Sequence, residues 1–183
     1  MRPVVRAKLP SNSLLNSSQY HYSDSYLTTL KDIYTGITPT QMGKAFFRSA
    51  PQWTESLFML RNRMVSFMGL KASTKPQNHL ELLAKFKCEP GEVLGLFKVF
   101  SKTDREVILG EDDKHLNFRV SLFCEPNPEG AGEKRLIIST TVKFNNWFGR
   151  LYFLPVRPIH RLIVPAMLKG MVKQLENIHK EQL

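Results

Sequence analysis

The sequence predicts an α+β fold in which an antiparallel sheet wraps around a long C-terminal helix. Residues 80–145 contain short apolar runs separated by turn residues, which is typical of strands joined by hairpins. From Trp147 to the end, apolar residues recur at steps of three and four, which is the period of a helix. A sheet with one apolar face must be covered, and a long amphipathic helix is the simplest cover.

The chain begins with a polar arm, residues 1–19, which is rich in Pro, Ser and Asn and which we expect to be extended or loosely packed. Residues 20–183 are assigned to a single domain. Its first strand is indicated by side chains at alternate positions, which is the period of a strand with one buried face. These side chains are Tyr20, Tyr22, Tyr26, Thr28 and Leu30.

Two short helices are predicted after this strand. Residues 38–41 (TPTQ) have the form of a capping box with proline at the first helical position, and Pro51 interrupts the helix that they begin. A second helix is predicted over residues 53–69, because apolar residues there recur at steps of four and three. Residues 71–77 are predicted to be a polar linker.

The strand region comes next. Residues 92–100 are apolar at nearly every position, which predicts one strand covered on both faces. A strand is predicted at 106–110, and another at 115–125 alternates between an apolar and a polar face. Residues 126–132 (PNPEGAG) form the clearest loop, and residues 135–144 form a β-branched strand. In the 115–125 strand, the apolar face holds Leu116, Phe118, Val120 and Leu122, and the polar face holds His115, Asn117, Arg119 and Ser121.

Three prolines, Pro155, Pro158 and Pro165, lie inside the C-terminal helical pattern. Each removes a backbone hydrogen bond and costs about 3 kcal/mol in a free helix. The pattern therefore predicts either a kinked helix or a short turn followed by a long helix from about Pro158.

The 183-residue chain has 26 Lys and Arg against 16 Asp and Glu, which gives a net charge of +10. With 42% apolar and 23% charged residues, the composition excludes an intrinsically disordered chain. The positive charge makes an anionic partner worth testing. However, residues 76–145 are nearly neutral, and no Lys/Arg stripe alternates with aromatic residues on the strands. This distribution argues against a nucleic-acid partner.

Two cysteines, Cys88 and Cys124, are too few for a disulfide framework and have no zinc-site spacing, so we expect reduced thiols and no metal site. The N-terminus lacks the apolar stretch of a signal peptide, and no apolar run approaches the ~20 residues of a membrane span. We expect a cytoplasmic protein for which weak association with a membrane surface stays open. No P-loop, nucleophile elbow or Gly-rich dinucleotide turn is present, so no cofactor is expected.

Three segments of the chain carry a resemblance to a known family. They are residues 109–122 (LGEDDKHLNFRVSL), residues 149–153 (GRLYF) with 156–164 (VRPIHRLIV), and the predicted helix pair with FFR at 46–48 and PQW at 51–53. Together they resemble a bacterial family called "domain of unknown function 2867", over roughly residues 20–175. The resemblance implies a helix-grip fold like that of the START and pollen-allergen superfamily, whose members often hold lipids, steroids or polyketides. It implies no activity, because the family has none assigned.

Asp113, His115 and Arg119 form the first candidate site, because they share one face of a predicted strand. A carboxylate beside an imidazole can serve acid–base chemistry, and an arginine beyond them can hold an anion. The alternative is a set of ion pairs on a solvated sheet face. Metal binding through Asp112, Asp113 and His115 is disfavoured, because three ligands from one strand cannot converge without a bulge.

Arg157, His160 and Arg161 form the second candidate site. Arg157 and Arg161 are one helical turn apart with His160 beside them, so they could bind an anionic head group at the mouth of a pocket. The alternative is that they pair with acidic residues 111–113 and tie the helix to the sheet. Aromatic residues, including Phe46, Trp53 and Phe118, are candidates for contact with an apolar ligand, although core packing explains them equally well.

Three functions remain open from the sequence. The first is binding of a small apolar or anionic amphipathic molecule in a pocket between the sheet and the C-terminal helix. The second is an enzyme of the cyclase, dehydratase or hydrolase kind that uses His115 and Asp113 as acid and base and Arg119 as anion holder. The third is a peripheral protein that docks on anionic lipid through its basic helices.

Overall fold

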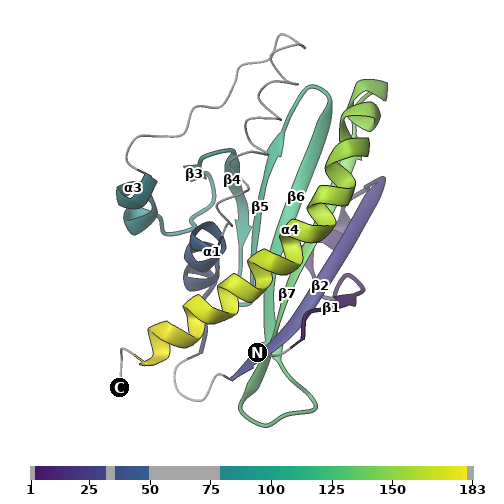
Figure 1. Cartoon of the computed structure of the whole chain (residues 1–183). Coiled ribbons are helices and arrows are strands. Elements are labelled where there is room, and N and C mark those ends of the chain that lie inside the picture. The colour runs from purple at the N-terminus through teal and green to yellow at the C-terminus, as the bar shows by residue number, and fades with distance from the viewer. Residues whose placement is uncertain (1–2, 32–35, 50–78, 181–183) are drawn as a thin grey trace.

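The computed structural model describes residues 3–31, 36–49 and 79–180. The chain order of its elements is shown in Figure 1. The strands are β1 (Val5–Ala7), β2 (Tyr22–Lys31), β3 (Val93–Leu94), β4 (Phe97–Lys102), β5 (Glu106–Asp112), β6 (Leu116–Pro126) and β7 (Glu133–Phe144). The helices are the short 3-10 helix η1 (Leu14–Ser17), α1 (Pro39–Arg48), α3 (His79–Lys85) and α4 (Trp147–Lys180).

The strands form one antiparallel sheet in the order β1-β2-β7-β6-β5-β4-β3. The helix α4 crosses one face of this sheet diagonally, and α1 lies beside it (Figure 1). The predicted α+β fold, with an antiparallel sheet around a long C-terminal helix, is therefore confirmed. The main core lies between α4, α1 and the sheet, where Met42, Leu122, Leu168 and Met171 are completely buried.

The first predicted helix is confirmed at α1. Thr38 accepts a hydrogen bond from the Gln41 amide, and the Gln41 side chain accepts one from the Thr38 amide, so both halves of the capping box form. Proline at the first position adds to this start because its ring sets the helical φ in advance. The second predicted helix and the linker fall within residues 50–78, which lie outside the described residues.

The predicted strands at 106–110, 115–125 and 135–144 are confirmed as β5, β6 and β7, and the loop at 126–132 joins the last two. The single strand predicted at 92–100 is wrong. It is a hairpin in which Leu94 pairs with Phe97 across a tight turn. Gly95 has a φ of +64°, which is a conformation open to glycine but costly for other residues, and this allows the chain to reverse.

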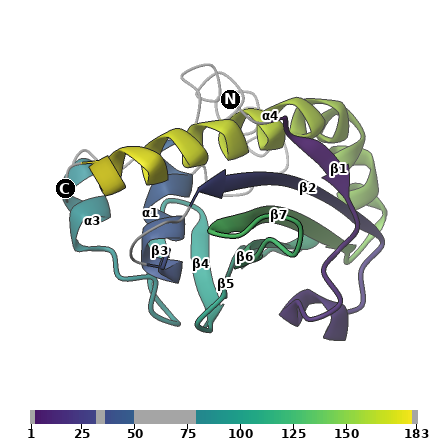
Figure 2. The same cartoon turned by 90° about the horizontal axis from the view of Figure 1, so that it is seen from below.

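The helix α4 is continuous from Trp147 to Lys180 and contains all three prolines. Of the two predicted alternatives, a turn followed by a helix from Pro158 is wrong, because the helix begins eleven residues earlier. Figure 2 shows the axis changing direction in its N-terminal turns. The prolines are tolerated because the carbonyls that they leave without an amide partner belong to Leu151, Leu154 and Arg161, which are exposed and can bind water.

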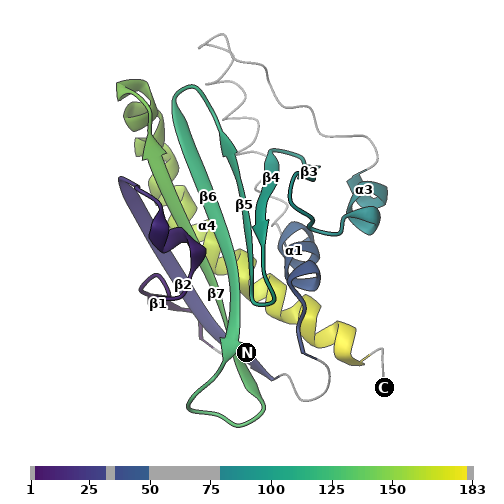
Figure 3. The same ribbon diagram turned by 180° about the vertical axis from the view of Figure 1, so that it is seen from behind.

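The N-terminal arm is not loosely packed. The strand β1 pairs with β2, and Leu15 in η1 is 2% exposed. Figures 2 and 3 show η1 on the face of the sheet opposite α4. This segment therefore covers the second apolar face of the sheet, where Ile108, Phe123 and Ile137 are also buried.

Glu106 fixes the arm to the sheet. Its carboxylate is 1% exposed and accepts hydrogen bonds from the Ser13 hydroxyl at 2.6 Å, the Leu14 amide at 2.9 Å and the Ser121 hydroxyl at 2.5 Å. A buried acceptor with three donors is fully satisfied, and the arm is needed to supply two of them. The polar composition of the arm is thus compatible with a packed position.

We expect Glu106→Ala to lower the free energy of unfolding by about 3 kcal/mol, because it leaves buried donors without an acceptor. Urea denaturation followed by circular dichroism measures this change. The matched control is Glu129→Ala in the exposed β6–β7 loop, for which we expect a change below about 0.5 kcal/mol. Similar losses in the two variants would contradict the assigned role of Glu106.

Candidate functional site

A cluster of polar side chains lies beneath α4, where the helix crosses the β2 edge of the sheet. We call Tyr22, Asp24, Thr140 and His160 the polar centre. Asp24 on β2 is the register partner of Thr140 on β7, and directly paired residues project from the same face of a sheet. His160 comes down onto Asp24 from α4, so that face is the one that the helix covers.

The Asp24 carboxylate is the acceptor at the polar centre. Its Oδ2 atom accepts a hydrogen bond from the Tyr22 hydroxyl at 2.7 Å and lies 3.2 Å from Nδ1 of His160. The Asp24 side chain is 0% exposed, and the His160 side chain is 19% exposed. Asp24 Oδ1 has no hydrogen-bond partner, and neither does Thr140 Oγ1. Two buried polar atoms are therefore left unsatisfied on neighbouring strands, which is uncommon in a native core.

The polar centre shifts the pKa of both its acidic groups. Burial on its own would raise the pKa of Asp24, but the hydrogen bond and charge of His160, the hydrogen bond from Tyr22 and the charge of Arg6 together lower it below its usual value. Burial and the adjacent Asp24 carboxylate raise the pKa of Tyr22 to about 12, although Arg161 acts in the opposite direction. Asp24 therefore stays ionised and Tyr22 stays neutral at physiological pH.

Apolar residues lie on both sides of the polar centre. One side is the small cluster of Leu116, Val142 and Phe153, in which the Phe153 ring packs edge-on against Tyr22 at 4.8 Å. The other side is the main core. Phe118 is half-buried and packs against both. The arrangement places a charged acceptor between two apolar surfaces under one helix.

The second candidate site of the sequence analysis contributes to the polar centre. His160 contacts Asp24, and the Arg157 guanidinium lies 5.3 Å from the centre of the Tyr22 ring. Arg157 and Arg161 are exposed on α4. His160 and Arg157 thus connect α4 to β2. Pairing with the acidic residues 111–113 was the alternative to ligand binding in the sequence analysis.

Sequence reasoning missed Asp24 and Thr140. Asp24 interrupts the alternation of Tyr22, Tyr26, Thr28 and Leu30 by placing a carboxylate at an inward position. That interruption was a usable signal, because a charged residue on a buried strand face needs a partner. Thr140 had no such signal, since threonine is common in exposed and buried strands alike.

The first candidate site is Asp113, His115 and Arg119, of which Asp113 and His115 join the β5–β6 hairpin to the residues before α4. The Asn146 amide contacts Nδ1 of His115 at 3.0 Å, while Asn146 Oδ1 accepts the Gly149 amide and caps the helix. Gly149 fits here because a Cβ atom would lie 2.1 Å from the His115 carbonyl oxygen. Asp113 accepts a hydrogen bond from the His115 amide.

Arg119 pairs with Thr141, the residue after Thr140. Because neighbouring residues of a strand point to opposite faces, its side chain lies on the face of the sheet opposite α4. It forms an ion pair of 2.7 Å with Asp112, and its guanidinium lies 3.5 Å from the centre of the Phe100 ring. These contacts separate Arg119 from the candidate base His115. The Arg119–Asp112 contact is an ion pair between neighbouring strands.

The three aromatic candidates differ in position. Phe46 is buried and contacts Phe47 and Phe97 edge-on, so it belongs to the core. Phe118 contacts Phe97 and borders the polar centre. Trp53 lies outside the described residues.

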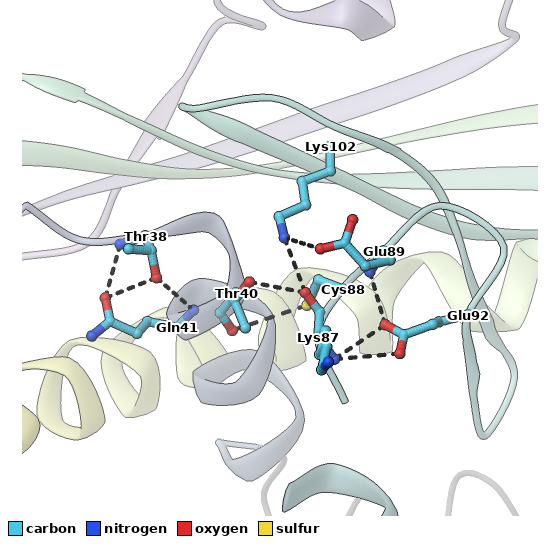
Figure 4. Close-up of polar contacts among 8 residues, drawn as sticks. All are labelled: Thr38, Thr40, Gln41, Lys87, Cys88, Glu89, Glu92 and Lys102. Atoms are coloured by element: carbon cyan, nitrogen blue, oxygen red, sulfur yellow. Dashed lines mark hydrogen bonds and ion pairs between the residues drawn. The ribbon is translucent and has the colours of Figure 1, made fainter. Parts of the chain in front are cut away.

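The loop before β3 holds a buried thiol. Cys88 has a φ of +58°, and its Sγ points toward the Thr40 carbonyl and α1 (Figure 4). Glu92 accepts amide hydrogen bonds from Lys87 and Glu89, and Lys102 pairs with Glu89 at 2.7 Å. Burial raises the pKa of Cys88 to about 12, so this group is a packed thiol and not a nucleophile. Cys124 is also buried and free, as expected.

Within the described ranges, no group of three or more His, Cys, Asp or Glu side chains is arranged to hold a metal ion. In the same part of the chain, no helix combines the length and hydropathy needed to cross a bilayer. The side chains of the polar centre provide one ionised carboxylate, two hydroxyls and one imidazole.

We expect the folded protein to lose stability between about pH 10 and pH 12 because of Tyr22. A phenol in the unfolded chain ionises near pH 10, whereas in the fold its pKa is about 12, so the stability is present below pH 10 and is lost as the pH rises. Urea denaturation at pH 9 and pH 11 measures the loss, which should be smaller in Tyr22→Phe. The exposed residue Tyr20 gives the control, since Tyr20→Phe should behave as wild type. An unchanged loss in Tyr22→Phe would contradict the assignment.

Comparison with known proteins places the chain in a family. Among curated proteins, no relative matches it. A family model described as "Protein of unknown function (DUF2867)" matches residues 17–167. The match runs from the end of η1 into α4, and it includes all four residues of the polar centre. Because it covers most of the chain, the protein belongs to this family, DUF2867.

Proposed function

We propose that the protein binds a small amphipathic molecule between the sheet and α4, with a hydroxyl group of that molecule at the polar centre. The observation that carries this proposal is the pair of unsatisfied buried atoms, Asp24 Oδ1 and Thr140 Oγ1, on adjacent strands. An unpaired buried acceptor costs about 1–3 kcal/mol, so an occupant that satisfies both atoms gains that energy.

The two atoms define the chemistry of the occupant. An ionised carboxylate only accepts hydrogen bonds, whereas a threonine hydroxyl both donates and accepts. A ligand hydroxyl placed between them can donate to Asp24 and accept from Thr140. Alcohols and phenols meet this requirement with one group, while carboxylates are repelled by Asp24 and hydrocarbons leave both atoms unpaired.

The surroundings support an apolar body for the ligand. Phe118 is half-buried between the small cluster and the main core, and Val142 lies beside it on β7. Binding sites for small molecules are mostly apolar with a few polar groups that fix orientation. An apolar ring or chain along Phe118 would bring its hydroxyl toward Asp24. Arg157 and Arg161, exposed on α4, could contact an anionic end of a longer amphipathic molecule.

Entry of the ligand would require movement of α4, because the two atoms are not accessible to solvent. Pro155 and Pro158 lie in the part of the helix that precedes His160 and leave two carbonyls without amide partners. This part of α4 therefore has fewer backbone hydrogen bonds than the part over the main core. Separation of the N-terminal turns from β2 is the motion that the proposal needs.

A catalytic function would use His160 rather than His115. Asp24 contacts Nδ1 of His160, which fixes the ring and leaves Nε2 as the nitrogen that can accept a proton. His115 uses its Nδ1 to hold Asn146 at the start of α4. We propose binding rather than catalysis, because a bound hydroxyl group would supply the hydrogen bonds that Asp24 Oδ1 and Thr140 Oγ1 lack.

The proposal predicts that 2-naphthol binds about tenfold more tightly than 2-methylnaphthalene, a probe of similar shape that lacks the hydroxyl. Isothermal titration calorimetry of the full chain measures both affinities. In Thr140→Val, which keeps the shape of the side chain and removes its hydroxyl, the ratio should fall, because the ligand hydroxyl then keeps only its hydrogen bond to Asp24.

The matched control is Thr141→Val, the same change at the next residue, whose side chain points to the other face of the sheet. Its affinity ratio should equal that of wild type. Absence of saturable binding by 2-naphthol, or an affinity ratio that Thr140→Val leaves unchanged, would overturn the proposal.

A further inference from the structure

We propose that the outer face of the N-terminal half of α4 docks on the surface of a bilayer that contains anionic lipids. This inference concerns the exposed surface of α4 and needs no occupant at the polar centre, although one of its arginines, Arg157, also lies over the Tyr22 ring. It rests on large apolar side chains that are exposed in a row and on arginines that flank them.

The apolar row is continuous along α4. Trp147, Leu151, Leu154 and Leu162 are 63%, 54%, 64% and 69% exposed, and Phe148 beside them is 41% exposed. Their spacing follows the helical period, with Pro158 also exposed between Leu154 and Leu162, so they form one stripe. We call this stripe the docking face. Single exposed apolar residues are normal, but a contiguous row of five on one helix marks an interaction surface.

Positive charge accompanies the docking face. Arg150, Arg157 and Arg161 are exposed, and their helical positions place all three along one side of the stripe. The exposed Lys169 and Lys173 continue the same face toward the C-terminus. Over its whole length α4 has six Lys and Arg but only one acidic residue, Glu176. The face is therefore both apolar and cationic.

This combination fits an anionic membrane better than the other partners. An amphipathic helix with Trp and Leu on one face and Arg or Lys beside them lies in the plane of the bilayer interface. Trp is favoured at that interface, and each basic residue adds attraction to anionic lipid. In a symmetric dimer through the stripe, the arginine rows of two copies would lie close together and repel. No described helix can span the bilayer, so the contact is a surface one.

The experiment is sedimentation of the full chain with vesicles of phosphatidylcholine alone or with 30% phosphatidylglycerol (about a third anionic lipid). We expect binding only to the anionic vesicles, and we expect it to weaken at least about fivefold when salt rises from about 50 to 500 mM, because the charges are screened. Brominated lipid should quench the fluorescence of Trp147, and this quenching should be absent in Trp147→Phe.

Variants distinguish binding through the docking face from attraction by the net positive charge of the protein. Arg150→Glu should reduce partitioning at least about fivefold, whereas Lys143→Glu, the same charge change at an exposed position on β7, should leave it nearly unchanged. The double variant Leu151→Ser/Leu154→Ser should also reduce partitioning while its circular dichroism matches wild type, because both side chains are exposed. Equal losses in Arg150→Glu and Lys143→Glu, or no binding to anionic vesicles, would overturn the proposal. So would a dimer in solution that the leucine variant dissociates.

Discussion

The packing of α4 against one face of the antiparallel sheet is the contact on which the rest of the structure depends. Leu168 and Met171 of the helix are completely buried against Leu122 and Ile138 of the sheet and their neighbours. In this sheet both faces carry buried apolar side chains, Leu122 and Ile138 on one and Phe123 and Ile137 on the other. Because α4 occupies one, the N-terminal arm takes the other and is held there by Glu106. Both covers are needed for a single stable layer of strands.

The two halves of α4 have different structural roles. The C-terminal half supplies the apolar side chains of the main core, whereas the N-terminal half contains Pro155, Pro158, His160 and the exposed apolar stripe. Burying Asp24 carries a desolvation cost, which the surrounding hydrogen bonds and positive charges outweigh, although one carboxylate oxygen has no partner. The unpaired buried atoms of Asp24 and Thr140 lie beneath this half, which is why the proposed binding site is placed there.

Residues 109–122, one of the segments that carry the family resemblance, have a structural role. Gly110 passes close to the Phe118 carbonyl, Asp112 pairs with Arg119, and His115 holds the asparagine that caps α4. These contacts fix where α4 begins and therefore where His160 meets β2. His160 of the polar centre lies in another segment of the resemblance, residues 156–164, so two parts of the family pattern have different structural roles.

The sequence by itself determined the α+β class, the capping box of α1, three of the central strands and the free cysteines, because each depends on local spacing or composition. It also singled out His160, which the structure places against Asp24, and Phe118, which packs between the two apolar clusters. Only the tertiary structure decided that His160 meets Asp24, that the Asp113 group supports the helix start and that the arm packs. Pairing between β2 and β7 joins residues more than a hundred positions apart, and strand periodicity shows which face a side chain occupies but not what covers it. The turn at Gly95 was missed for a related reason, since an apolar run has the same appearance whether it continues or reverses.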